Sequence, residues 1–350
     1  MVVRMPMDMD YLSANMHGRR SRLAEAERLD ALCRIRTIPE LVRAVAPDAE
    51  SDTAVALQRR LVQDVLKELE WLVRLTPTAH SLFDWMRTRF QVENLKVLAR
   101  GFAAGARFET LAPHLLPLPK DLAVDAPALA AADSIEAFAS LVRSTPLWRG
   151  IQAIFEVYHN YPRSFFIEAA LDRSYFIELL VRLDGISESD RADGEAVIRQ
   201  EVDTFHMMLV TRGKFHYGLK PEQLMPFHVA GTVINRRRLR AMLSAPDLGS
   251  AAARAVGAAI DAMPLEMKGP GGAESAADLE ALAWNRFLRL ANRAFRWNHT
   301  GVGAVVGYLA VRRVELANLI ILSEGIRAGL APEAIRRRLI PRTDLETARV

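Results

Sequence analysis

We predict an all-α protein built from three similar helical-bundle domains in tandem, and two observations support this fold class. First, apolar residues recur at i, i+3, i+4 and i+7 along most of the chain, whereas the alternating pattern of β-strands is almost absent. Second, one local pattern occurs three times: a long helix that carries Asn or His, a Gly that ends this helix, and a short helix that follows. The sequence therefore predicts packed helices throughout.

The three copies are evenly spaced along the chain. Asn94, His206 and Asn318 are 112 residues apart, since 206 − 94 and 318 − 206 both equal 112. A Gly follows each of them after 11, 12 and 11 residues; these are Gly105, Gly218 and Gly329. Solenoid repeats measure about 20–50 residues, whereas about 100–150 residues make a whole domain. We therefore predict three modules, at residues 1–118, 119–230 and 231–350.

The first module is predicted to contain four helices. One extends from about residue 8 to 36, and a short one begins at Thr37, which has the spacing of a capping box with Glu40. Two long helices follow, at 51–75 and 78–102. The second of these carries the first copy of the repeated pattern.

The remaining modules follow a similar plan. Residues 111–134 are rich in Pro and Ala and predict a linker. Residues 184–194 and 268–275 are polar or Gly-rich and predict loops, and the third module is predicted to begin near residue 229. Helices are predicted at 134–144, 145–158, 164–183, 194–213, 276–296, 300–324 and 332–339.

Composition excludes several classes of protein. The 350 residues are half hydrophobic, enough for two or three cores, and the formal charge of +4 gives little support to nucleic-acid binding. A single Cys33 excludes an internal disulfide and indicates a reducing compartment. No apolar run reaches the ~18–20 residues that span a bilayer, and residues 1–10 lack the apolar core of a secretion signal. We expect a soluble protein that reaches a membrane only through a partner.

The polar residues of the repeat predict a structural role. Each Asn or His follows a polar or acidic residue by three positions, which places the two side chains on one helix face. Asn is a mediocre helix former, so an Asn within a helix is expected to bond a neighbouring helix or backbone. The six residues are Gln91, Asn94, Asp203, His206, Glu315 and Asn318.

Patterns of catalytic or cofactor sites are weak. Asp203, His206, His216 and His228 could be proposed as metal ligands, but their spacings of 3, 10 and 12 match no recognised ligand set. The glycines at 301, 303 and 307 lack a preceding strand and a following Lys-Ser or Lys-Thr, so close helix packing explains them better than a nucleotide loop. We predict no catalytic residues, no cofactor and no metal.

Two basic clusters leave two interpretations open. The first contains Arg236, Arg237, Arg238 and Arg240, and the second contains Arg336, Arg337 and Arg338. Solvated helix surface is the simpler interpretation, because cations are favourable near a helix C-terminus. Docking of an acidic protein partner is the functional alternative.

Several segments resemble a known family. The opening Asp10-Tyr-Leu-Ser-Ala-Asn-Met-His-Gly-Arg-Arg-Ser-Arg22-Leu23 resembles the start of the central-stalk C (or d) subunit of V/A-type rotary ATPases. Further segments are similar to later signatures of that family, although His206 stands where Asn is usual and Glu324 replaces the Arg found at Arg100 and Arg212. These segments are Ile167-Glu-Ala-Ala-Leu-Asp172-Arg-Ser-Tyr175-Phe176, Glu201-Val-Asp203 with Arg212-Gly-Lys214, and Val314-Glu315-Leu-Ala-Asn318-Leu-Ile.

The resemblance implies an all-helical, funnel-like arrangement of three similar domains with pseudo-threefold symmetry. It implies a non-catalytic socket that couples the central shaft to the membrane rotor ring, for ATP-driven proton or sodium transport or for ATP synthesis. The implied partners are shaft subunits of the D and F type and the rotor-ring proteolipids, with no nucleic acid. The implied location is cytoplasmic and peripheral on the membrane. Two alternatives remain: a helical scaffold or regulator outside the rotary ATPase, and a metal-dependent helical enzyme using Asp203, His206 and His216.

Overall fold

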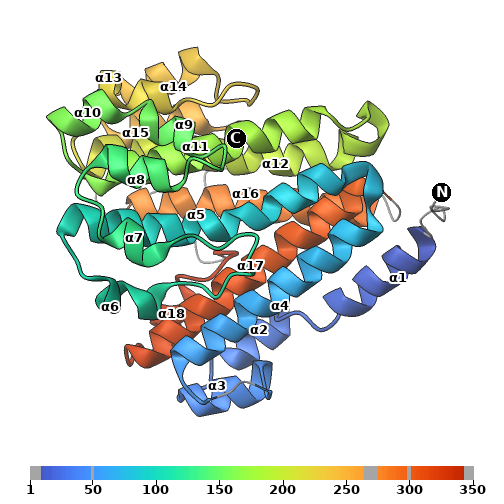
Figure 1. The fold of residues 1–350 in the computed structure, drawn as a ribbon. Helices are drawn as coiled ribbons and strands as arrows, with labels where there is room; N and C mark the ends of the chain where they lie inside the picture. The colour runs from blue at the N-terminus through green and yellow to red at the C-terminus, as the bar shows by residue number, and fades with distance from the viewer. Residues whose placement is uncertain (1–8, 49–50, 264–274, 298–300, 343–350) are drawn as a thin grey trace, which may run out of the picture. The chain divides into compact units, whose positions relative to one another are not determined.

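The protein is helical, as predicted, in the part of the chain that the computed structural model describes. This part comprises residues 9–48, 51–263, 275–297 and 301–342, and it contains no β-strand, only one isolated bridge between Val256 and Ile260. Figure 1 shows the helices in chain order. They are α1 (Met9–Arg20), α2 (Ala26–Leu32), α3 (Ile38–Val45), α4 (Ala54–Leu75), α5 (His80–Ala104), α6 (Phe108–Leu111), α7 (Ala126–Ala130), α8 (Ile135–Leu141), α9 (Trp148–Gln152), α10 (Phe155–Asn160), α11 (Ser164–Asp184), α12 (Glu188–Met208), α13 (Pro221–Leu224), α14 (Arg236–Leu243), α15 (Leu248–Ala255), α16 (Ser275–Trp297), α17 (Val302–Arg327) and α18 (Pro332–Arg336).

The chain divides into two compact units. Unit 1 combines residues 1–84, 183–200 and 284–345, and unit 2 combines residues 85–182, 201–283 and 346–350. Each unit is therefore assembled from segments that are far apart in the sequence, and α5, α11, α12 and α16 each contribute residues to both units. The division into modules 1–118, 119–230 and 231–350 stays a prediction.

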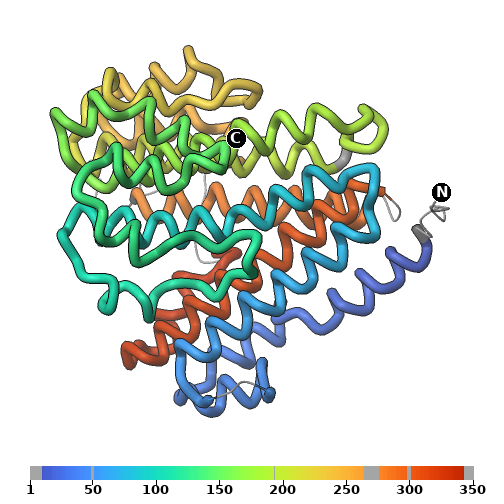
Figure 2. The backbone as a smooth tube through the Cα atoms, viewed as in Figure 1, coloured from blue at the N-terminus to red at the C-terminus, as the bar shows by residue number. Residues whose placement is uncertain are grey.

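Helices α4 and α17 form the centre of unit 1. They lie side by side, as Figures 1 and 2 both show for the blue and the red helix. Helix α4 begins at the cap Thr53, whose hydroxyl accepts the Ala56 N–H at 3.2 Å, and its apolar stripe is buried as the periodicity predicts. Gly307 of α17 lets the backbone of α16 approach, since a Cβ at this position would lie 2.6 Å from the Ala291 carbonyl oxygen. Gly307 therefore allows close helix packing, as the sequence analysis favours over a nucleotide loop.

In unit 2, a short helical pair that the sequence did not predict follows the second copy of the repeat. Helices α14 and α15 pack against each other. Each begins at a polar cap: the side chain of Asn235 accepts the Arg238 N–H at 2.9 Å, and that of Asp247 accepts the Ser250 N–H at 2.7 Å. The pair was missed because its apolar runs are too short to show a helical period.

Several predicted boundaries were wrong. The single helix expected at 8–36 is two helices, α1 and α2, separated by a turn at residues 21–25. The loop expected at 184–194 is mostly helix, because α12 already begins at Glu188, where two acidic residues occupy its first turn. The helix expected at 145–158 is broken into α9 and α10. Most of the loop predicted at 268–275 lies outside the described residues.

The three glycines that end the long helices have left-handed backbones. Their φ angles are +62°, +67° and +68° at Gly105, Gly218 and Gly329. We expect Gly329→Ala to lower the free energy of unfolding by about 1–2 kcal/mol, because an L-residue is strained there while the space around its Cβ is open. Urea unfolding measures this change. Gly18→Ala in α1 is the matched control: its surroundings are also open and its φ is not positive, so it should not destabilise the protein.

Candidate functional site

The Asn residues of the repeat clasp a backbone segment downstream. The Asn94 side chain donates its N–H to the Leu116 carbonyl at 2.9 Å and accepts the Leu116 N–H at 2.7 Å. Asn318 does the same to Ile340, with distances of 2.6 Å and 2.9 Å. In both copies the clasped residue lies 22 positions after the Asn. Of the two kinds of partner predicted for these Asn residues, a neighbouring helix or backbone, the structure shows backbone in both copies.

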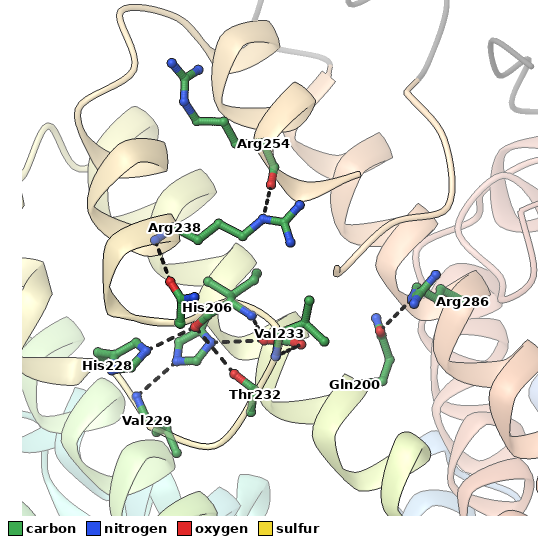
Figure 3. A network of polar contacts seen from close by, with 12 residues as sticks. Gln200, His206, His228, Val229, Thr232, Val233, Arg238, Arg254 and Arg286 are labelled. Carbon is green, nitrogen blue, oxygen red and sulfur yellow. Dashed lines mark hydrogen bonds and ion pairs between the residues drawn. The ribbon is translucent and has the colours of Figure 1, made fainter. Parts of the chain in front are cut away.

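His206 occupies the equivalent place in the second copy, and Figure 3 shows it between its partners. Its Nε2 accepts the N–H of Val229, 23 residues downstream, at 3.0 Å. The ring proton must then lie on Nδ1, which faces the Asp203 carboxylate at 3.5 Å. The single N–H of this tautomer faces Asp203, so the ring has no N–H to donate to the carbonyl of the clasped residue. The second clasp therefore uses one hydrogen bond where Asn uses two.

The residue three places earlier binds backbone in a different way in each copy. Gln91 donates to the Leu122 carbonyl at 3.0 Å. Asp203 accepts the N–H groups of Val233 and Ile234 at 3.2 Å and 2.9 Å. The segment predicted as a linker at 111–134 is thus held at Leu116 and Leu122 by α5. In the third copy the bonded backbone lies upstream instead, because Glu315 accepts the Ala24 N–H at 2.6 Å.

A second set of three glycines lets the short helix of each copy pack against the long helix. One Gly in each long helix lies under an aliphatic side chain of the following short helix, so that a Cβ on the Gly would collide with that side chain at 2.3–2.7 Å. The pairs are Gly101 with Leu111, Gly213 with Leu224 and Gly325 with Ile335. The three glycines are again 112 residues apart, since 213 − 101 and 325 − 213 both equal 112. This regularity is present in the sequence, but it was not among the predicted features of the repeat.

The second copy contains one extra residue between these glycines. Gly101 and Gly325 precede the left-handed Gly by four positions, whereas Gly213 precedes Gly218 by five. The helix around Gly213 is a π-helix, Leu209–His216, whose wider turn holds one more residue than an α-turn. The π-helix accommodates the extra residue, and the residue that His206 bonds lies 23 rather than 22 positions downstream.

The polar groups of the repeat are used within the protein. The hydrogen-bonding groups of Asn94, Asp203, His206 and Asn318 are directed at the protein's own backbone or at one another. His206 and His228 stack with ring centroids 5.0 Å apart, yet no group of three or more metal-ligating side chains occurs among the described residues. Cys33 is buried, and burial raises the pKa of its thiol above the usual value. The arrangement braces the backbone.

A buried ion network in unit 1 was not predicted. Glu68 of α4 accepts hydrogen bonds from Tyr308 at 2.5 Å and from Arg312 at 3.1 Å, and Arg312 also bonds Glu315. All four side chains are buried. Burial raises the pKa of Glu315 despite the opposing effect of Arg312. The one available signal was the position of Glu68 within the apolar stripe of α4, three residues after Val65 and four before Leu72.

The two basic clusters differ in how their arginines are used. Arg238 donates to the carbonyls of Arg254 and Val256 at 2.6 Å and 2.9 Å, so it ties α14 to the end of α15 (Figure 3). Arg336 pairs with Asp30 at 2.5 Å. The side chains of Arg236, Arg237, Arg240, Arg337 and Arg338 are exposed. Their predicted role in partner docking stays a prediction.

His228 is expected to make the free energy of unfolding depend on pH. Desolvation lowers the pKa of His228, and the nearby charges of Arg236 and Arg173 lower it further, against a hydrogen bond to the Ile234 carbonyl. The unfolded chain, with its His pKa of about 6.5, then binds this proton more tightly than the folded protein. Stability should therefore fall as the pH decreases below about 6.5, until the folded His228 is protonated too.

Urea unfolding at about pH 7.5 and about pH 5.5, on either side of the unfolded His pKa, measures this effect. We expect His228→Gln to lose less stability than the unaltered protein over that interval, because Gln keeps a donor for Ile234 and does not titrate. An equal loss in both proteins would contradict the assignment.

Among the described residues, no helix combines the length and the apolar character that crossing a lipid bilayer requires.

Known proteins resemble this chain along most of its length. The model of the family described as "ATP synthase (C/AC39) subunit" matches residues 12–338. Two curated proteins, each named as the C subunit of an A-type ATP synthase, are similar at low identity. The protein from Methanosphaera stadtmanae is 20% identical over 317 residues, which cover 90% of this chain and 80% of the relative. The protein from Methanothermobacter thermautotrophicus is 23% identical over 339 residues, which cover 94% of this chain and 87% of the relative.

Proposed function

Because the chain belongs to the ATP synthase (C/AC39) subunit family, we propose that it is a non-catalytic central-stalk subunit of a V/A-type rotary ATPase. It would act as a socket that couples the central shaft to the membrane rotor ring, in ATP-driven ion transport or in ATP synthesis. Its partners would be shaft subunits of the D and F type and the proteolipids of the ring. It would be peripheral on the membrane through this complex.

The observation that carries the proposal is the extent of the match. The family model covers residues 12–338, and both relatives named as the C subunit of an A-type ATP synthase align over at least 90% of this chain. A match of this extent includes all three copies of the repeat and every long helix. The relatives' names assign them to an ATP synthase, and we propose the same assignment for this chain.

The physical character of the repeat also supports a mechanical role. A part that passes torque must resist bending at helix ends, where backbone groups are otherwise unpaired. In this chain the segment after each of the three repeat helices, α5, α12 and α17, is hydrogen-bonded back to that helix by Asn94, His206 or Asn318. Local opening of helix ends makes a helical protein less stiff. These hydrogen bonds restrict such opening.

Affinity purification from native membranes tests the proposal. A tagged chain should co-purify with ring proteolipids and shaft subunits, identified by mass spectrometry. Deletion of the chain should reduce ATP-driven ion pumping by membrane vesicles to background while the detached catalytic head still hydrolyses ATP, and the unaltered gene should restore pumping. Recovery of the chain without any rotary partner, or unchanged pumping after deletion, would exclude the socket.

A further inference from the structure

A cavity of about 430 Å³ lies in unit 1 among α1, α2, α4 and α17. Small-molecule sites are commonly about 300–1,000 Å³. The cavity is therefore of the size that holds a small molecule. Of the six repeated polar residues, only Glu315 lines the cavity. The structural role of the repeat therefore does not explain the cavity.

The floor of this cavity is a cluster whose charges compensate one another; Glu68, Arg312 and Glu315 are buried, and the Arg19 side chain is 42% exposed. It contains two cations, Arg19 and Arg312, and two carboxylates, Glu68 and Glu315. Arg19 lies 3.2 Å from Glu68, and Arg312 bonds both carboxylates. The floor is thus neutral and fixed by several hydrogen bonds, as a preorganised binding site requires.

The rim of the cavity, by contrast, is strongly cationic. Arg22, Arg28 and Lys67 line it and are exposed, and within the described part of the chain none of them is ion-paired with a carboxylate. Arg28 donates to the Arg22 carbonyl, which holds the two residues together but leaves both charges in place. The one further acid in the lining, Asp64, is held by Arg60 at 3.0 Å. Counted over the whole lining, five cations face three carboxylates, so the cavity carries an excess of positive charge.

The chemistry of this rim selects an anion with several charges. Guanidinium groups bind phosphate oxygens through paired N–H donors, and a lysine adds a point charge. A concave site with an excess of positive charge also concentrates anions from solution. Trp71, with Arg19 over its ring at 4.4 Å, adds an aromatic wall that suits an organic ligand.

We propose that this cavity binds a small molecule that carries two or more phosphate groups, held at Arg22, Arg28 and Lys67. The rim recognises only the phosphate groups, so an inorganic polyphosphate and an organic one share the chemistry that it selects. The proposal does not rest on the proposed function, because it follows from the cavity and its charges alone.

Isothermal titration calorimetry on the full chain tests the proposal, with tripolyphosphate and ATP as probes. We expect saturable binding at one site, weakened as the salt concentration rises. Arg22→Ala and Lys67→Ala should each raise the Kd for tripolyphosphate about tenfold or more, since each removes a charge-assisted contact. Both residues are exposed, so both variants should fold. Arg337→Ala, an exposed arginine outside the cavity lining, is the matched control and should leave the Kd unchanged.

The outcomes separate the possible ligands. Binding of tripolyphosphate and ATP with equal affinity would support the phosphate site without a contribution from the organic part, and tighter binding of ATP would support a contribution from the aromatic wall. Absence of saturable binding of both probes, or equal weakening by Arg337→Ala, would overturn the proposal. Binding of a poly-glutamate peptide but not of tripolyphosphate would also overturn it and assign the rim to an acidic protein partner.

Discussion

Replacing Glu68 by Gln is expected to lower the free energy of unfolding by about 3–5 kcal/mol, the range found when one partner of a buried ion pair is removed. The change keeps the size of the side chain but removes its charge. Arg312 is 11% exposed, and after the change only Glu315 would compensate it within this cluster. Tyr308 would also lose its charged acceptor.

Urea unfolding of Glu68→Gln measures this cost. Glu70→Gln on the same helix is the matched control, because Glu70 pairs with Arg74 at 3.8 Å on the surface and such pairs contribute at most about 1 kcal/mol. The cost of Glu68→Gln should be smaller in an Arg312→Met background, where no buried cation is left unpaired. An equal cost in both backgrounds would show that Glu68 does not act through Arg312.

Replacing Asn318 by Ala is expected to lower the free energy of unfolding by about 2–4 kcal/mol, because a buried N–H and a buried C=O lose their partners and each unsatisfied group costs about 1–3 kcal/mol. The side chain is 2% exposed and satisfies both backbone groups of Ile340, which is itself buried. Asn94→Ala should cost less, because Leu116, which Asn94 bonds in unit 2, is only half-buried. Urea unfolding measures both changes.

The control for this pair of variants is Asn160→Ala, since the exposed Asn160 bonds only the Glu156 carbonyl of its own helix. It should change stability by less than about 0.5 kcal/mol. Hydrogen exchange adds a local measurement: the Ile340 amide should exchange faster in Asn318→Ala by more than the change in global stability accounts for. Unchanged protection at Ile340 would show that the clasp does not hold this segment.

The sequence predicted the kind of fold and the role of the repeated side chains better than their partners. An Asn within a helix indicated a bond to a neighbouring helix or to backbone, and Asn94 and Asn318 bond backbone. The position of the partner depends on how the chain returns to the helix, which periodicity does not encode, so Leu116 and Ile340 were not foreseen. Glu68 was not singled out, because its burial depends on α17, which lies more than two hundred residues later in the chain.

The boundaries that failed have local causes. The break between α1 and α2 contains neither Gly nor Pro, and the intermittent apolar stripe on both sides continues across it. The charged composition of residues 188–194 predicts a loop, but acidic residues also favour the first turn of a helix, and Glu188 and Asp190 occupy the first turn of α12. In the second basic cluster Arg336 pairs with Asp30, far away in the sequence, which the charge pattern alone could not reveal.

The discontinuous composition of unit 1 has a consequence for biosynthesis. Its first 84 residues leave the ribosome long before residues 284–345, which complete the unit. At about 5–20 residues per second, the 244 positions that separate Glu68 from Arg312 take about 12–50 s to be made. During that interval the apolar face of α4 has no α17 to cover it. The nascent chain must therefore be shielded, by its own other helices or by a chaperone, until its last long helix has emerged.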